Sequence, residues 1–211
     1  MSKLDNIRSN LAGQALLVAV SKTRKIEQII ALYEQGQQDF GENRVQELAM
    51  KAEQLPQLHW HFIGHLQTNK VRDVVRYAHL IHSLDRLNLA EALQKEAAKQ
   101  EKTIDVLIQV NLAQEETKGG FAKEEVIPFL QTMDRYPSLR IRGIMCMGPH
   151  VDDQEHIRQI FQEAKNLFQT CKEVRHVQVC MDYLSMGMSD DYLIALAEGS
   201  NMVRIGSLLF E

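Results

Sequence analysis

Cysteine is scarce in this sequence, and its spacing excludes two classes of protein. Cys146, Cys171 and Cys180 are the three cysteines in 211 residues, an odd number with no Cys-x-x-Cys pair. Disulfide frameworks and structural zinc sites both need sets of cysteines at short, regular spacing. The sequence therefore predicts reduced thiols in a cytoplasmic protein.

An excess of positive charge and long hydrophobic runs are also missing. Lys and Arg number 24 against 28 Asp and Glu, which gives a formal net charge of −4. Without a basic cluster there is no electrostatic footprint for nucleic acid. No apolar run reaches the length of a signal-peptide core or a transmembrane helix. We therefore expect neither a nucleic-acid partner nor a membrane partner.

What the sequence does contain is a regular alternation of strand and helix patterns. No linker or low-complexity tract interrupts it, so residues 1–211 are expected to form a single domain. Helical spacing of apolar residues separates the strands, and one further helix is expected over residues 3–12. The expected strands are 16–22, 39–43, 59–64, 80–84, 104–111, 139–147, 177–184 and 202–210.

Eight strands alternating with helices predict an α/β fold with a closed parallel barrel. The prediction is a single (β/α)8 TIM barrel with an extra N-terminal helix. An open doubly wound sheet is the alternative, but such sheets usually stop at five or six strands. The last expected strand runs almost to the end of the chain, so the N-terminal helix could fill the place of the usual last helix.

The stretch from Leu16 to Lys22 is the first candidate for chemistry. Five apolar residues without alternation are typical of a strand buried on both faces, and Ser21 and Lys22 follow directly. A lysine at the mouth of a barrel can lose solvation and become a nucleophilic amine toward carbonyl groups. The alternative is a solvated strand end without a function.

The ends of the last two strands resemble a phosphate cradle. Barrels place their chemistry after the carboxyl ends of the strands, and phosphate sites commonly follow strands seven and eight. A ligand that needs both such a cradle and an amine is an aldehyde carrying a phosphate, and pyridoxal 5′-phosphate meets both demands. The cradle candidates are Ser185, Met186, Gly187, Gly206 and Ser207.

Arg204 lies between the two halves of this cradle in the sequence. A guanidinium is always charged, so one aimed at a pyridine nitrogen would donate a hydrogen bond and keep that nitrogen unprotonated. An unprotonated ring is a poorer electron sink, which suits racemase-type chemistry or simple carriage of the cofactor. The alternative for Arg204 is a structural salt bridge at a strand end.

Three runs of sequence resemble the YggS/PROSC family of pyridoxal-phosphate homeostasis proteins. They are Phe40-Gly41-Glu42-Asn43 with Val45-Gln46-Glu47-Leu48, the run from Trp60 to Lys70, and Leu184-Ser185-Met186-Gly187-Met188-Ser189. The resemblance extends in order from Leu16 to Phe210. The sequence departs from the family pattern at Arg24-Lys25, where a lysine-proline is frequent, and at Ser207, where threonine is frequent.

The resemblance implies a barrel similar to the N-terminal domain of bacterial alanine racemase, without the second domain of that enzyme. It also implies a Schiff base between Lys22 and pyridoxal 5′-phosphate. Asn43 ends the expected second strand, and from that position it could lie beside or over the pyridine ring. Family members are believed to carry, buffer and deliver this cofactor without an established reaction. The expected protein is therefore a cytoplasmic monomer whose partners are pyridoxal phosphate and apoenzymes that depend on it.

A pyridoxal-dependent amino-acid racemase is the alternative function. Racemization needs a base on each face of the substrate, and in alanine racemase the second base is a tyrosine from a partner chain. Five single residues also admit a second interpretation. His59, His61 and His65 could bind a metal, although packing and hydrogen bonding suit them better. Lys70 and Lys118 are rivals of Lys22, expected at the surface or on a phosphate.

Overall fold

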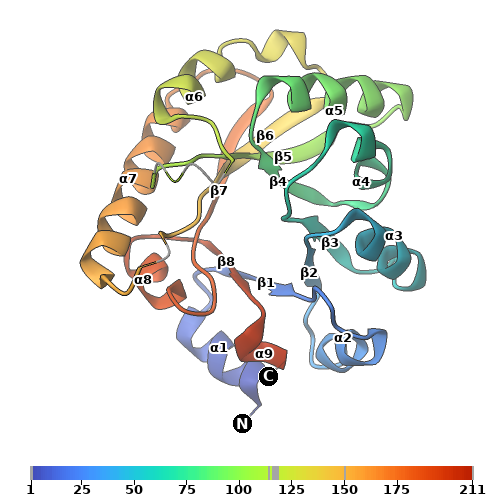
Figure 1. Ribbon diagram of the computed structural model, residues 1–211, viewed down its shortest axis with the longest axis vertical. Helices are drawn as coiled ribbons and strands as arrows, with labels where there is room; N and C mark the ends of the chain where they lie inside the picture. Colours follow the sequence, from blue (N-terminus) through green and yellow to red (C-terminus); the bar gives the residue numbers. More distant parts are fainter. Residues whose placement is uncertain (1, 114, 116–118, 150, 211) are drawn as a thin grey trace.

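A closed barrel of parallel strands forms the centre of the protein (Figure 1). The computed structural model describes residues 2–113, 115, 119–149 and 151–210. Within these residues eight strands pair in sequence order, and β8 pairs with β1 to close the barrel. The predicted fold class is confirmed. The strands are β1 Leu16–Val20, β2 Asp39–Glu42, β3 His59–Phe62, β4 Leu80–Leu84, β5 Ile104–Gln109, β6 Leu139–Met145, β7 Val179–Ser185 and β8 Met202–Ile205.

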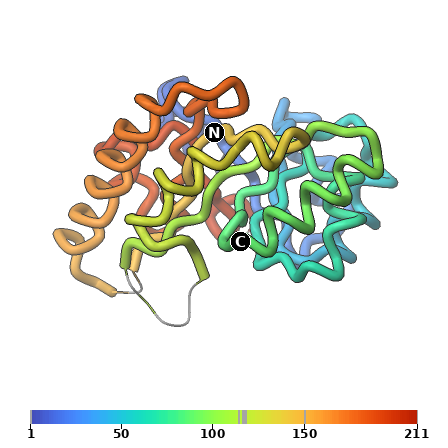
Figure 2. Tube along the Cα trace, turned by 90° about the horizontal axis from the view of Figure 1, so that it is seen from above, coloured from blue at the N-terminus to red at the C-terminus, as the bar shows by residue number. Residues whose placement is uncertain are grey.

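Helices surround the barrel, with α3 to α5 and α7 on opposite sides (Figures 1 and 2). The predicted N-terminal helix is present as α1, and Ser2 and Asp5 cap its start reciprocally. None of the described helices is long and apolar enough to cross a membrane. The helices are α1 Lys3–Leu11, α2 Ile26–Tyr33, α3 Val45–Gln54, η1 Thr68–Lys70, α4 Val71–Tyr77, α5 Leu87–Lys99, α6 Lys123–Leu130, η2 Met133–Arg135, α7 Gln154–Lys172, α8 Tyr192–Ala197 and α9 Ser207–Phe210.

The expected eighth strand, residues 202–210, is wrong in its second half. The strand ends at Ile205, and α9 begins two residues later at Ser207. Leu209 of α9 is buried, and α9 packs beside α1, so both helices cover the outside of the barrel near β8 and β1. An apolar run of this length fits a strand or a short buried helix equally well, because periodicity cannot separate them.

Alternate residues of each strand face the inside of the barrel. In β1, Leu16 and Val18 belong to a small apolar cluster inside the barrel, while Leu17 and Ala19 pack in the larger core that includes the helices. This is the two-residue period of a strand whose two faces are both buried. Continued past the strand, the same period directs Val20 and Lys22 toward the barrel mouth.

Candidate functional site

A cavity of about 550 Å³ opens at the carboxyl ends of β1, β2, β3, β7 and β8. This is the end at which barrels of this class place their sites. We call it the Lys22 cavity. Five of the predicted site residues meet there, although they come from distant parts of the sequence. The residues that line it are Val20, Lys22, Thr23, Arg24, Asn43, Ile63, Gly64, Met188, Ser189, Asp190, Arg204, Gly206 and Ser207.

Lys22 lies two residues beyond the end of β1 and is exposed in the cavity. The side chain of Lys22 is therefore solvated, as the alternative interpretation of this strand end has it, and the loss of solvation that such a position permits is not found. The next residue, Thr23, has a backbone φ of 62°, which is uncommon for a β-branched residue. The loop thus turns sharply at Lys22 and leaves its amine accessible from solvent.

Arg204 is buried inside the barrel at 4% exposure. Its Nη1 donates to the carbonyl and the hydroxyl of Ser185 at 2.9 and 2.6 Å, and its Nη2 donates to the Cys146 carbonyl at 2.9 Å. Burial lowers the pKa of Arg204, against the opposing influence of Cys146 and Asp191. All three acceptors are neutral, and no carboxylate among the described residues forms an ion pair with Arg204 at short range. The salt-bridge alternative for this residue is therefore wrong.

A chain of hydrogen bonds runs through the barrel from its amino end to Arg204. Asp39 Oδ1 lies 3.0 Å from His61 Nε2, and His61 Nδ1 lies 2.9 Å from His82 Nε2. His82 Nδ1 then lies 3.3 Å from the Ser185 hydroxyl, which accepts from Arg204. Burial, followed by the charges of His61 and Arg204, lowers the pKa of His82 well below 6.5. His82 is therefore a neutral link in this chain.

Replacing His82 by Gln is expected to flatten the acid dependence of stability. His82 is neutral in the folded state and binds a proton below about pH 6.5 only after unfolding. The free energy of unfolding therefore decreases as the pH is lowered below about 6.5, by up to ~1.4 kcal/mol per pH unit. Denaturant unfolding between about pH 7 and pH 5 measures this slope. His156→Gln, on the exposed surface of α7, should leave it unchanged. Equal slopes for the His82 variant and the wild type would contradict the assignment.

The predicted phosphate cradle is only partly assembled. Gly206 and Ser207 line the Lys22 cavity, whereas Ser185 and Met186 are fully buried and do not. The hydroxyl of Ser185 instead serves Arg204 and His82. Gly187 is also absent from the lining. Its φ is +95° and a Cβ there would lie 2.6 Å from the Ala195 Cβ, so packing against α8 requires a glycine.

Ser189, in the same run of sequence, lines the cavity in place of Ser185. Its hydroxyl accepts from the Gly206 backbone N–H at 3.4 Å, which ties the loop after β7 to the loop after β8. Asn43 also lies in the lining and is exposed. The polar side chains that line the cavity are thus those of Lys22, Arg24, Arg204, Asn43, Thr23, Ser189, Ser207 and Asp190.

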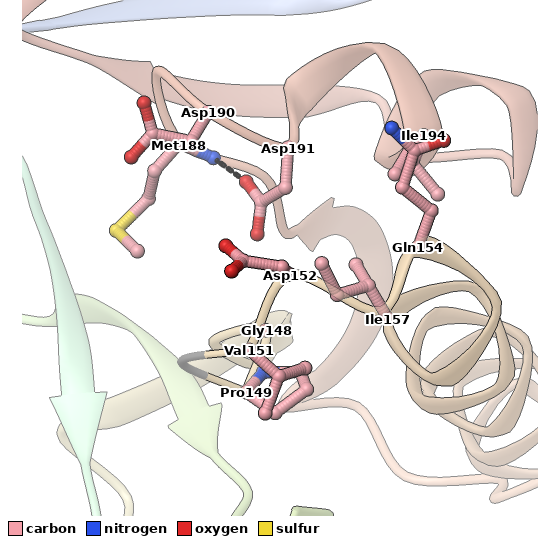
Figure 3. Close-up of a pocket in the computed structure, with 10 residues that line it drawn as sticks. All are labelled: Gly148, Pro149, Val151, Asp152, Gln154, Ile157, Met188, Asp190, Asp191 and Ile194. Atoms are coloured by element: carbon pink, nitrogen blue, oxygen red, sulfur yellow. Dashed lines mark hydrogen bonds between the residues drawn. The ribbon is translucent and has the colours of Figure 1, made fainter.

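A second cavity of about 480 Å³, which we call the Asp191 cavity, adjoins the first and shares Met188 and Asp190 with it (Figure 3). Asp152 and Asp191 also line it. Asp191 accepts the Met188 N–H at 2.6 Å, and burial raises the pKa of its carboxyl despite that bond. An acidic wall repels a phosphate, so the Lys22 cavity is the better anion site.

The remaining candidates lie elsewhere. Lys70 ends the short helix η1 and does not line the cavity, and Lys118 lies outside the described residues. His59 and His61 both contact Asp39 at the amino end of the barrel, whereas His65 contacts Asp85 at 3.0 Å. In the part of the chain that the structure describes, no three side chains are grouped to hold a metal ion.

Known proteins resemble this chain over nearly its whole length. The family model of the alanine racemase N-terminal domain matches residues 2–211. A pyridoxal phosphate homeostasis protein of Aquifex aeolicus is 43% identical over 198 residues, 93% of this chain and 86% of that protein. The same name belongs to a Synechocystis protein that is 37% identical, in an alignment that covers 99% of this chain and 96% of that protein. This chain belongs to the family of pyridoxal phosphate homeostasis proteins.

The family membership confirms the resemblance drawn from the three sequence runs. PipY of Synechococcus elongatus PCC7942, solved without PLP, has a TM-score of 0.93 at 34% identity, covering 99% of this chain and 98% of PipY. PipY with PLP bound has a TM-score of 0.86 at 33% identity, with the same coverage. Alanine racemase of Clostridium difficile 630 has a TM-score of 0.80 at 15% identity over 55% of its chain, which shows a shared fold.

Sequence reasoning missed the residues that surround Lys22 in this family member. Glu42, Glu47 and Lys51 contact the loop that carries Lys22, and none was singled out for a role. One signal was available for Lys51. It lies three residues after Leu48 on the apolar face of α3, where an unpaired lysine would be costly.

Proposed function

We propose that this protein binds pyridoxal 5′-phosphate in the Lys22 cavity and acts as an intracellular carrier and buffer of that cofactor. The observation that carries the proposal is the meeting of an accessible lysine amine, a buried guanidinium and serine hydroxyls in one cavity. Relatives that bear the name pyridoxal phosphate homeostasis protein support it, as does the PLP-bound structure of PipY.

The donor set of the cavity fits each part of this cofactor. Lys22 would hold the aldehyde carbon as a Schiff base, formed when Nζ bonds the carbon and one water molecule leaves. Ser189 and Ser207 offer hydroxyl groups to the phosphate, and Gly206 lies between them in the cavity wall with its N–H already donated to Ser189. Arg204 would donate to the pyridine nitrogen. When bound, the cofactor supplies a reversible covalent link to amines.

Carriage suits this site better than racemization. Racemization requires a second proton-transferring side chain on the far face of the substrate, and tyrosine supplies it in alanine racemase. In the described part of the chain, no tyrosine lines the Lys22 cavity. The Tyr192 hydroxyl accepts a hydrogen bond from the Asn10 side chain, and Tyr183 lines a separate cavity at the amino end of the barrel. We propose that the protein works as a monomer in the cytoplasm and delivers the cofactor to apoenzymes.

Borohydride trapping tests the covalent site. The purified protein, mixed with pyridoxal 5′-phosphate and reduced, is expected to carry one stable phosphopyridoxyl group on Lys22. Peptide mapping by mass spectrometry locates it. Lys22→Ala should lose the label and the visible absorbance yet melt at the wild-type temperature, because Lys22 is exposed and its side chain supports no core contact. A label on Lys70, or none, contradicts the proposal.

An amino-acid screen separates the carrier from the enzyme. The loaded protein is incubated with single L-amino acids and assayed for the D-enantiomer, for carbon dioxide and for amino-group transfer. Carriage predicts no turnover beyond that of free pyridoxal phosphate. Sustained turnover that disappears in Lys22→Ala would favour the racemase alternative.

A further inference from the structure

We propose that Glu47 and Lys51 are positioning residues for Lys22, and that they act by fixing the peptide groups on both sides of it. This inference rests on the proposed function, because it assigns a task to residues around the amine that binds the cofactor. Both residues lie on α3, on the outside of the barrel, and neither lines the Lys22 cavity.

Lys51 holds the peptide group that precedes Lys22. Its Nζ donates to the Ser21 carbonyl at 2.8 Å, and that carbonyl belongs to the peptide joining Ser21 to Lys22. Lys51 is a buried lysine at 1% exposure, whereas lysine is rarely fully buried unless its ammonium group is paired. Its ammonium group is therefore held at the loop that follows β1, where it contacts the Ser21 carbonyl.

Glu47 holds the peptide group that follows Lys22. The backbone N–H of Thr23 donates to Glu47 Oε2 at 2.8 Å, and this N–H belongs to the peptide joining Lys22 to Thr23. Thr23 has a φ of 62°, a conformation that β-branched residues avoid unless their surroundings impose it. The hydrogen bond from the Thr23 N–H to the Glu47 carboxylate helps to hold Thr23 in this conformation.

The two side chains that make these hydrogen bonds, Lys51 and Glu47, also contact each other. Lys51 Nζ lies 3.1 Å from Glu47 Oε2, an ion pair between residues four apart on one helix. Glu42 completes the cluster, since its Oε1 accepts from Lys51 at 2.7 Å and from the Ser21 hydroxyl at 2.6 Å. Fixing both flanking peptide planes fixes the backbone dihedral angles of Lys22, and so the direction in which its side chain leaves the chain.

The cluster is costly as a purely structural device. Glu42 is fully buried, and its Oε2 has no hydrogen-bond partner among the described residues. Well-packed apolar residues would fill such a place at least as stably as a buried ion pair. The contacts of Lys51 and Glu47 converge on the two peptides around one exposed amine. A preorganised amine strengthens binding by reducing the ordering cost, and it does so only for a ligand that bonds to it.

The test compares two ligands that differ at one carbon. Pyridoxal 5′-phosphate has an aldehyde, whereas pyridoxine 5′-phosphate has an alcohol there and cannot bond to Lys22. Dissociation constants are measured by calorimetry for wild type, Glu47→Ala, Glu47→Gln and the control Glu53→Ala. Glu53 lies on the same helix, where its Oε1 accepts from the Tyr77 hydroxyl on the exposed surface. Thermal melts establish that each variant is folded.

Glu47→Ala is expected to weaken binding of pyridoxal 5′-phosphate about tenfold, the scale of one charge-assisted hydrogen bond, and to leave pyridoxine 5′-phosphate unchanged. Glu47→Gln retains an acceptor for Thr23 and should recover most of the affinity. Glu53→Ala should match the wild type for both ligands. Equal weakening of both ligands by Glu47→Ala, or of neither, overturns the positioning role. If the wild type binds neither phosphate ligand, the proposed function itself fails.

Discussion

Lys51→Met is expected to lower the free energy of unfolding by about 3–5 kcal/mol, the cost of leaving one member of a buried ion pair without its partner. Methionine replaces the apolar stem of lysine and lacks only the terminal ammonium group, so the loss reports mainly on the charge. Glu42 would then lie buried with the Ser21 hydroxyl still donating to it but without the ammonium group. The Ser21 carbonyl would lose the Lys51 donor as well.

The loss of stability caused by Lys51→Met, measured as the free energy of unfolding, should depend on pH. Burial already raises the pKa of Glu42, although hydrogen bonds from Lys51 and Ser21 oppose the rise. Loss of Lys51 raises it further. A carboxyl whose pKa is higher in the folded state favours folding below its unfolded pKa and loses that contribution as pH rises through the folded pKa. The variant should therefore be closer to wild type at about pH 5 than at about pH 8.

Denaturant unfolding monitored by circular dichroism measures this prediction, and a fall of melting temperature by about 10 °C accompanies it. The double variant Glu42→Gln with Lys51→Met removes both charges and should recover part of the loss. Lys99→Met, at the exposed end of α5, is the matched control and should change stability by less than ~0.5 kcal/mol. A Lys51→Met protein as stable as this control would show that the pair is dispensable.

Gly64→Ala is expected to cost about 3 kcal/mol and to damage the Lys22 cavity at the same time. A Cβ at Gly64 would lie 2.1 Å from the Asn43 carbonyl oxygen, which is backbone and cannot rotate away. Just before this point β2 and β3 are still paired, through the Ile63 N–H and the Glu42 carbonyl at 2.9 Å. The methyl group would force the exits of the two strands apart and move Asn43 and Ile63 in the cavity wall.

Thermal melts and the dissociation constant of pyridoxal 5′-phosphate together measure the effect of Gly64→Ala. Gly13→Ala provides the comparison, because nothing lies within 4 Å of a Cβ there and its φ of +72° imposes backbone strain alone. That variant should lose about 1–2 kcal/mol and bind the cofactor normally. If Gly64→Ala bound the cofactor as tightly as Gly13→Ala, the close approach at the strand exits would not shape the site.

The alternation of strands and helices was enough to predict the barrel and the end at which its site lies. Parallel strands bring their carboxyl ends together, so Lys22, Asn43, Arg204, Gly206 and Ser207 could be grouped without knowledge of any distance. The register of the strands explains why Ser185 contacts Arg204 and does not line the cavity. Its inward position was predictable from the two-residue period, but the depth at which its hydroxyl meets Arg204 depends on the stagger of β7 against β8, which the sequence does not show.

Buried charge was the feature that the sequence showed least clearly. The place of Lys51 on the apolar face of α3 hinted at its burial, but its partners Ser21, Glu42 and Glu47 are gathered around it only by the barrel. The boundary between β8 and α9 was missed for a different reason. Four apolar or small residues after Gly206 carry no period that separates a strand from a single helical turn.

The charges around the Lys22 cavity have a consequence for how quickly it captures a ligand. Lys22, Arg24 and Arg204 line it against one carboxylate, Asp190, although the chain as a whole carries a formal charge of −4. Salt screens distant charges beyond ~8 Å, so a small anion near the mouth experiences this local positive field. The same field falls off within about the same distance, so the local excess of positive charge acts on small anions that come close to the barrel mouth.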